Sequence, residues 1–178
     1  MERSGLKKII LILVLFHSSF VFADQKDSRL NSLFDELFLS NDNMQASSIL
    51  ADIWNIWSIA ENVEAQKIFD EGNKMMDRGS LEEAIALFTQ VIDLKPDFAE
   101  GWNKRATVLF LKGELEASIL DIQKTLELEP RHFGALDGLA EIYLIQDDLF
   151  GAAATYNRIL EIIPTSKKSQ DRLKLINE

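Results

Sequence analysis

Cysteine is absent from the 178-residue sequence, and histidine occurs only at His17 and His132. Without cysteine the chain forms no disulfide, no thiolate zinc site, no iron–sulfur cluster and no cysteine nucleophile. Two histidines leave few groups for acid–base chemistry near neutral pH. We therefore expect a protein that is not an enzyme and has no cofactor, no metal site and no small-molecule substrate.

Basic residues are outnumbered, since 19 lysines and arginines face 29 aspartates and glutamates and give a formal net charge of −10. A chain of this charge repels phosphate backbones, which argues against nucleic acid as the main ligand. Proline and glycine are also scarce, with three and eight residues, so low-complexity and collagen-like chains are excluded. The apolar fraction of 47% is ordinary for a globular protein.

No apolar run in the sequence reaches the roughly 20 residues that span a membrane. The longest, Ile9–Phe16, follows the basic residues Arg3, Lys7 and Lys8 and ends well before Asp24. A basic start, a short apolar run and a small residue before the charges are typical of a signal peptide. We expect residues 1–23 to be a signal peptide cleaved after Ala23, with the periplasm as the compartment. An uncleaved membrane anchor is the alternative.

The three prolines reveal an internal repeat, because Pro96, Pro130 and Pro164 are each 34 residues apart. Other positions keep the same step and the same kind of side chain. Three sets of equivalent positions carry large apolar side chains: Ile68, Trp102 and Leu136; Met75, Leu109 and Tyr143; and Phe88, Ile122 and Tyr156. Two further sets, the small columns, carry small side chains: Gly72, Ala106 and Ala140; and Ala84, Ser118 and Ala152.

Each repeat is predicted to be a helix, a short turn, a second helix and a proline. Apolar residues at helical spacing form a packing face, and the small columns let neighbouring helices approach closely. Gly79 and Gly113 suit a turn with positive φ, which Asp147 in the third copy also tolerates. Each proline ends the second helix because it lacks an N–H and clashes with the preceding turn.

This pattern resembles the tetratricopeptide repeat family from about residue 65 to Pro164. The resemblance implies an all-α, right-handed α-solenoid in which residues 63–164 form three helix pairs, at 65–98, 99–132 and 133–166. The departures are local: Glu71 and Arg105 stand where the family usually has leucine, and Ser118 replaces its usual alanine.

Two flanking segments lack the motif but are helical in pattern. Residues 24–62 are predicted to form an N-terminal helix pair with two apolar faces, one of which carries Trp54 and Trp57. We expect this pair to cap the first repeat. Residues 165–178 are predicted to form a closing helix bearing Leu173, Leu175 and Ile176, since a terminal repeat otherwise exposes an apolar face.

In the resembling family, the first helix of each repeat lines a concave groove. Transferred to this sequence, the peptide-binding residues would be Phe69, Asp70, Asn73, Met76, Asp77, Asn103, Lys104, Thr107, Phe110, Asp137 and Glu141. Across the whole lining stripe, five acids, including Glu100, face one base, Lys104. An acidic groove repels a carboxylate, so the expected partner is a basic or apolar segment of another protein.

The function predicted from these features is a non-catalytic adaptor or scaffold for protein–protein interaction. Alternatives are a self-associating structural protein of the cell envelope and, if the signal is uncleaved, a membrane-tethered adaptor. Paired carboxylates at Glu82-Glu83 and Asp147-Asp148 are interpreted as helix-start residues, because acids there favour the helix dipole. His132, at a repeat junction, is interpreted as a surface or capping residue rather than a catalytic base.

Overall fold

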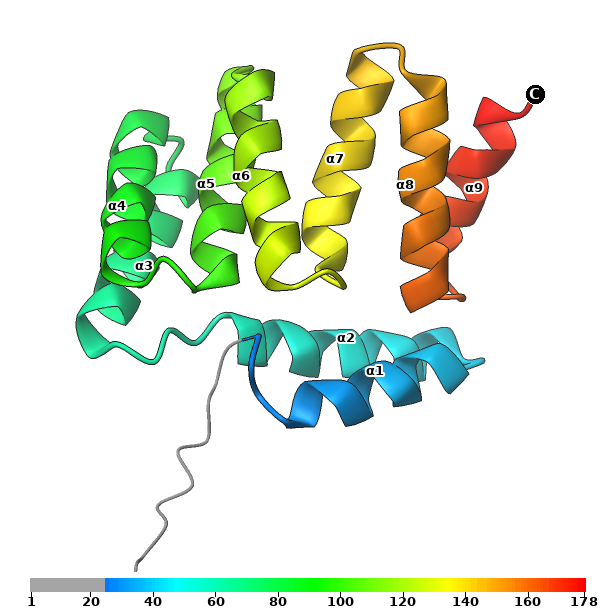
Figure 1. Ribbon diagram of the computed structural model, residues 1–178, viewed down its shortest axis with the longest axis horizontal. Coiled ribbons are helices and arrows are strands. Elements are labelled where there is room, and N and C mark those ends of the chain that lie inside the picture. The colour runs from blue at the N-terminus through cyan, green and yellow to red at the C-terminus, as the bar shows by residue number, and fades with distance from the viewer. Residues whose placement is uncertain (1–24) are drawn as a thin grey trace, which may run out of the picture.

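The computed structural model describes residues 25–178, and the predicted signal peptide lies outside them. The described chain is helical throughout, without a strand, which confirms the all-α solenoid (Figure 1). Its helices are α1 Arg29–Leu39, α2 Asn43–Trp57, α3 Val63–Asp77, α4 Leu81–Leu94, α5 Ala99–Lys112, α6 Leu115–Leu128, α7 Phe133–Ile145, α8 Leu149–Ile162 and α9 Lys167–Ile176. Over this range, no helix has both the length and the apolar character needed to cross a bilayer.

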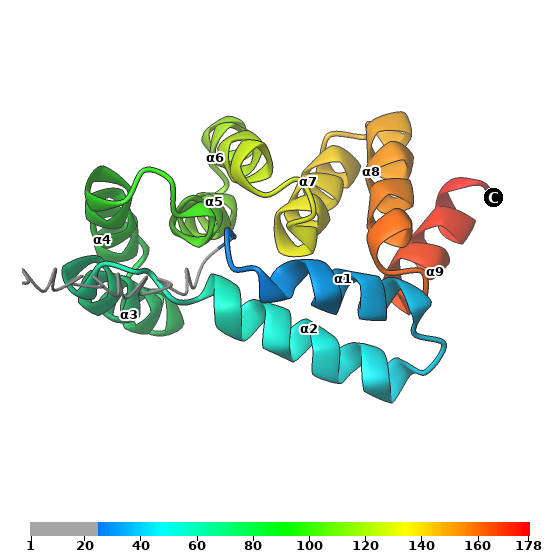
Figure 2. The same ribbon diagram turned by 60° about the horizontal axis from the view of Figure 1, so that its bottom comes forward.

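The helices α3 to α8 form three consecutive hairpins in two layers, with α3, α5 and α7 in one layer and α4, α6 and α8 in the other (Figure 2). The three predicted turn residues have positive φ, at 76° for Gly79, 81° for Gly113 and 59° for Asp147. Each second helix ends two residues before its proline. The turns and helix ends are therefore those that the 34-residue pattern predicts.

Small residues lie where helices of a hairpin approach each other. At Gly72 an added Cβ would lie 2.7 Å from the ring of Phe88, so only glycine fits there. Ala84 and Ala152 are fully buried in the corresponding places of the second helices. Ser118, the departure from alanine, is equally buried, and its hydroxyl donates to the carbonyl of Ala106 at 2.8 Å, which satisfies the polar group.

The arginine at the usual leucine position replaces an apolar contact by a bidentate ion pair. Arg105 on α5 donates from Nε and Nη2 to the two carboxylate oxygens of Asp121 on α6, at 2.7 and 2.8 Å. Its remaining nitrogen, Nη1, donates to the hydroxyl of Thr89 on α4 at 3.1 Å. One side chain thus ties three helices of two neighbouring repeats together.

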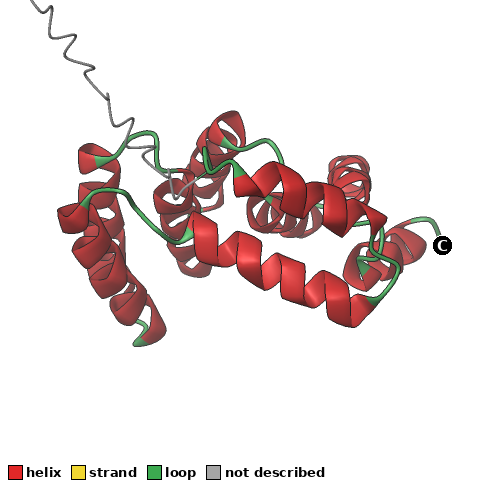
Figure 3. Cartoon of the chain, turned by 90° about the horizontal axis from the view of Figure 1, so that it is seen from below, coloured by secondary structure: helices red, strands yellow, loops and turns green. Residues whose placement is uncertain are grey.

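The N-terminal helix pair, α1 and α2, does not cap the first repeat, so that prediction is wrong. It runs across the lower edge of the array, beneath the ends of the repeat helices (Figures 1 and 3). Its apolar residues, among them Leu37, Ile53 and Trp57, share one buried cluster with Leu136 of α7 and Tyr156 of α8. The pair therefore belongs to the core of the third repeat.

Polar contacts hold the pair to the junctions between repeats. Gln25 bonds to the carbonyl of Asp97, and Lys26 pairs with the Asp97 carboxylate at 2.5 Å. The guanidinium of Arg131 lies 4.1 Å from the ring centroid of Phe34 on α1. These contacts attach the pair to both the first and the second repeat junction.

The closing helix α9 packs beside α8 at the C-terminal end of the array (Figure 1). Its N-cap is Ser166, whose hydroxyl accepts from the backbone N–H of Ser169 at 3.4 Å. Leu173 and Ile176 are partly buried against the third-repeat cluster, whereas Leu175 is exposed. Two of the three predicted apolar residues therefore make the predicted contact.

Candidate functional site

The groove face is the exposed side of α3, α5 and α7, where the resemblance to the family places the binding residues. The structure leaves part of that set accessible and buries the rest. Asp70, Asp77 and Thr107 are exposed; Asn73, Met76, Lys104, Phe110, Asp137 and Glu141 are partly buried; and Phe69 and Asn103 are buried. Within residues 25–178, no three histidine, aspartate or glutamate side chains are grouped so as to hold a metal ion.

On α3, the groove face is acidic and open. Asp70 accepts a hydrogen bond from the side chain of Gln66 at 2.9 Å, and the described residues offer neither Asp70 nor Asp77 an ion-pair partner. The side-chain oxygen of Asn73 is buried and accepts no hydrogen bond from any described residue. The prediction that Phe69 lines the groove is wrong. Its ring centroid lies 5.3 Å from that of Phe98 and 5.8 Å from that of Phe88, so the side chain is in the core.

In the first turns of α5, the lining residues Glu100 and Asn103 take part in a buried hydrogen-bond network. Glu100, only 1% exposed, accepts from the amide of Asn103 at 2.9 Å. The same carboxylate oxygen lies 2.9 Å from Nε2 of His132. Lys104 lies 3.5 Å from the second carboxylate oxygen. Glu100 and the side-chain NH2 group of Asn103 therefore belong to a network that holds the array together, although Oε1 of Glu100 accepts no hydrogen bond within the described residues.

His132 has its tautomer fixed by two neighbours. Its Nδ1 accepts the backbone N–H of Ala135 at 3.1 Å, which caps α7, so Nε2 carries the proton that faces Glu100. The imidazole is fully buried. The sequence interpretation of a capping residue is correct, but the histidine is a core residue and not a surface one.

Trp54 of α2 covers Gly134 in the first turn of α7. An added Cβ at Gly134 would lie 2.7 Å from the indole of Trp54, so the glycine is needed for this contact. Trp54 also packs edge-on against Phe133, with ring centroids 5.3 Å apart. The N-terminal helix pair thus closes one end of the groove face in the third repeat.

The acids of α7 are paired with α9, which corrects the expectation of an uncompensated acidic stripe. Lys168 lies 2.8 Å from Asp137 and 3.0 Å from Glu141, and Arg172 lies 3.4 Å from Glu141. Burial by itself raises the pKa of Glu141, but Lys168, Arg172 and the Tyr156 hydroxyl together lower it below its usual value. The pKa of Tyr156 is raised by its burial and by the charge of Glu141.

Between α5 and α7 the groove face is hollowed by a cavity of about 70 Å³, the α5–α7 cavity. Three of the predicted residues meet there: Asn103, Thr107 and Phe110. The remaining lining is small or aliphatic and consists of Ala106, Ser118, Ile122, Gly134, Ala135 and Gly138. The accessible groove face therefore comprises α3, the exposed side of α5 and this cavity.

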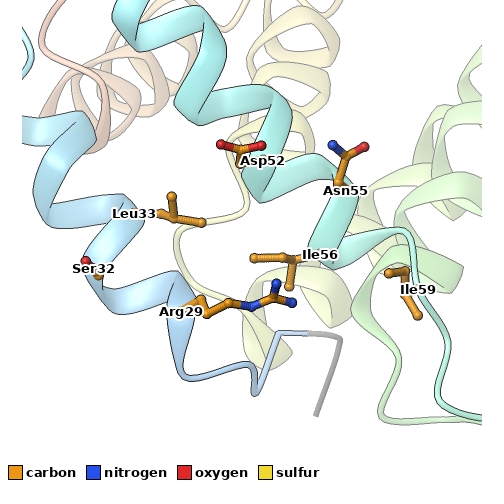
Figure 4. Close-up of a pocket in the computed structure, with 7 residues that line it drawn as sticks. All are labelled: Arg29, Ser32, Leu33, Asp52, Asn55, Ile56 and Ile59. Atoms are coloured by element: carbon orange, nitrogen blue, oxygen red, sulfur yellow. The ribbon is translucent and has the colours of Figure 1, made fainter. Parts of the chain in front are cut away.

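A larger hollow of about 510 Å³ lies between α1 and α2 (Figure 4), the N-terminal cavity. Its apolar lining is Leu33, Ile56 and Ile59. Arg29, Ser32, Asp52 and Asn55 contribute polar groups around it. Arg29 is already engaged by Asp27, to which Nη2 donates at 2.7 Å. The sequence did not single out this hollow.

Comparisons with known proteins agree with the repeat geometry. A profile of the TPR repeat matches residues 72–113. A TPR repeat-containing protein of Rhizobium etli is 33% identical over 150 residues, which make up 84% of this chain and 74% of that protein. The chain belongs to the tetratricopeptide-repeat (TPR) family. Human DnaJ homolog subfamily C member 3 is 24% identical over 110 residues, but this TPR chain spans only 22% of that relative's length.

Solved TPR structures share the fold. The first TPR domain of Spaghetti (RPAP3), bound to an HSP90 peptide, aligns with a TM-score of 0.60 and 23% identity over 64% of this chain and 90% of that one. The structure of MamA aligns with a TM-score of 0.61 and 18% identity over 78% of this chain and 84% of that one. At such identities the likeness shows the TPR fold alone.

Proposed function

We propose that this TPR protein is a non-catalytic adaptor or scaffold that binds a segment of another protein on the groove face. The observation that carries the proposal is the α5–α7 cavity, which gathers Asn103, Thr107 and Phe110 beside an acidic and open α3. The RPAP3 domain, which has the same fold, is bound to a peptide. That example supports a peptide as the kind of ligand.

The charges of the groove face favour a basic or apolar segment. Asp70 and Asp77 remain without an ion-pair partner among the described residues, whereas Asp137 and Glu141 are paired with α9. Complementary charge speeds association and selects partners. A segment carrying lysine or arginine therefore suits α3, and an acidic chain terminus does not.

Capture followed by kinetics tests this function. Residues 24–178 are used to capture partners from an envelope extract, alongside the double variant Asp70→Lys/Asp77→Lys and a control, Glu161→Lys on α8. The captured partner should bind the parent and the control alike, and its association rate with the double variant should fall at least tenfold at low salt. Equal binding to all three proteins would contradict the proposal.

Export to the periplasm is part of the proposal. It is supported by the basic start, the apolar run Ile9–Phe16 and the small residue Ala23 before the first acid of the following segment. Cleavage after Ala23 would release a chain that starts one residue before the described part. A tethered adaptor is the outcome if the segment stays attached.

Self-association through the N-terminal helix pair is the second candidate function. The observation that favours it is the N-terminal cavity, together with the exposed apolar side chains of Phe38, Leu39 and Met44 at the α1–α2 turn. Light scattering on residues 24–178 over a concentration series decides it. A mass equal to that of a single chain at every concentration would rule out self-association and leave the adaptor function.

A further inference from the structure

Gly138 lies in the middle of α7, where glycine weakens a helix relative to alanine. Other helical glycines are explained by crowding, since an added Cβ would lie 2.7 Å from Phe88 at Gly72 and 2.7 Å from Trp54 at Gly134. At Gly138 the nearest atom is Cδ1 of Ile122 at 3.6 Å, which is an ordinary contact. Neither packing nor a positive φ therefore requires glycine at this position.

Gly138 lies in the wall of the α5–α7 cavity, as Gly134 does, but unlike Gly134 it has no close neighbour that requires a glycine. Ile122, the side chain that a Cβ at 138 would meet, lines the same cavity. Any side chain at 138 would therefore take up part of its volume of about 70 Å³. The glycine keeps the hollow open at the expense of helix propensity.

The lining of the cavity defines the group that fits it. Ala106, Ile122 and Ala135 are buried and form an aliphatic surface beside the partly buried ring of Phe110. The polar side chains in the lining, Asn103, Ser118 and Thr107, are uncharged. Placing a charged group against such a surface costs far more free energy than placing an aliphatic one. The cavity therefore selects an uncharged, compact apolar side chain.

We propose that the α5–α7 cavity is the anchor subsite of the groove face and takes a branched aliphatic side chain, leucine, isoleucine or valine, from the partner segment. Lysine or arginine elsewhere in the same segment faces Asp70 and Asp77 on α3, which have no cation of their own within the described residues. This inference rests on the proposed adaptor function and specifies its ligand. The occupant is a segment of another protein with that chemistry.

Two substitutions at Gly138 separate the effect of filling the cavity from the effect on helix stability. Gly138→Ala adds one methyl group that fits beside Ile122, and it should raise the thermal midpoint by about 2–4 °C, as removal of a helical glycine predicts. Gly138→Met fills the cavity. Ala154→Met, at an exposed position of α8, is the matched control. A midpoint that falls in Gly138→Ala would overturn the inference, because packing would then require the glycine.

Isobutanol serves as a direct probe of the cavity. Titrated into residues 24–178, it should shift the methyl NMR signals of Ile122, Ala106 and Ala135 in a saturable way. The shifts should persist in Ala154→Met and vanish in Gly138→Met. Shifts that survive Gly138→Met, or that never appear in the parent, would contradict an aliphatic subsite.

A displayed library of random 12-residue peptides then tests the segment. Selection on the parent should enrich peptides with one fixed leucine, isoleucine or valine near lysine or arginine, and Gly138→Met should weaken their binding at least tenfold. Binders that lack the aliphatic position and ignore Gly138→Met would overturn the subsite while leaving the adaptor function intact. If the groove face yields no binder at all, the adaptor function fails and the subsite fails with it.

Discussion

The imidazole of His132 lies parallel to the indole of Trp57, with ring centroids 4.3 Å apart and an angle of 11° between the planes. His132 belongs to a repeat junction and Trp57 ends α2, so this stack joins the N-terminal helix pair to the array. The other edge of the same imidazole faces Glu100 of the second repeat at 2.9 Å. Three parts of the protein therefore meet at one buried ring.

Trp57→Ala should be among the most destabilising substitutions. Trp57 is 1% exposed, and truncating a large buried aromatic costs about 3–5 kcal/mol. Trp102 is only partly buried, with its indole N–H donating to the carbonyl of Pro96 at 3.0 Å, so Trp102→Ala should cost clearly less. Chemical denaturation of the two variants and the parent measures the difference. A loss in Trp57→Ala well below about 3 kcal/mol, or below that in Trp102→Ala, would contradict the place of Trp57 in the core.

The bridge between Arg105 and Asp121 should show strong coupling. Asp121→Ala leaves a partly buried guanidinium without its carboxylate and should cost about 1–3 kcal/mol. The double variant Arg105→Leu/Asp121→Ala restores the leucine usual in the family and should be close to the parent in stability. The exposed pair of Lys124 and Glu127 is the control, and Lys124→Ala should change stability by about 0–1 kcal/mol. Additive losses in the double variant would contradict the coupling.

Acid should loosen the closing helix. The pKa of Glu141 is lowered in the fold, so its pairing with Lys168 and Arg172 contributes stability above the ordinary value of 4.5 and loses it as pH falls below that value. At neutral pH, Glu141→Gln should reduce stability by about 0–1 kcal/mol, and the difference from the parent should disappear in acid. Thermal midpoints from pH 7 down to pH 3 measure this. Glu161→Gln, at an exposed position on α8, should show no such pH-dependent difference.

Export predicts a defined N-terminus. Intact-mass analysis of protein from the envelope fraction should show a chain that starts at Asp24, because Ile9–Phe16 is too short to remain as a membrane span. Replacing Ala23 by a bulky residue such as tryptophan should block cleavage and raise the mass. Recovery of the parent as a full-length 20.2 kDa chain in membranes would favour the tethered adaptor instead.

The repeats were predictable because their signals are local. Gly79, Gly113 and Asp147 have the positive φ that their turns require, and each proline follows a helix end, since backbone sterics act within a few residues. The site of the N-terminal helix pair was not predictable in this way. An apolar stripe shows that a helix buries one face, but it does not identify the surface against which that face packs. Trp57 stacks on His132, which is far from it in the sequence.

The groove was predicted in part for a similar reason. The resemblance to the family assigns Phe69 to the lining stripe, but its ring packs against Phe88 and Phe98 in the core. The sequence does contain a signal for the neutralisation of Glu141. Lys168 and Arg172 are four residues apart, so they share one face of α9 and present two cations together. Gly138 carried another signal, because an unexplained glycine in mid-helix points to a space that is kept open.

Site-specific photo-crosslinking tests the central claim, binding on the groove face, most directly. A photoreactive amino acid is placed at Asp70 or Thr107 on the groove face, at Leu120 on α6 in the opposite layer, or at Asn55 beside the N-terminal cavity, all of which are exposed. Irradiation of cells producing each variant should give a covalent adduct with another protein from positions 70 and 107, and none from position 120. Adducts from position 55 alone would contradict the groove and assign the interface to the N-terminal helix pair.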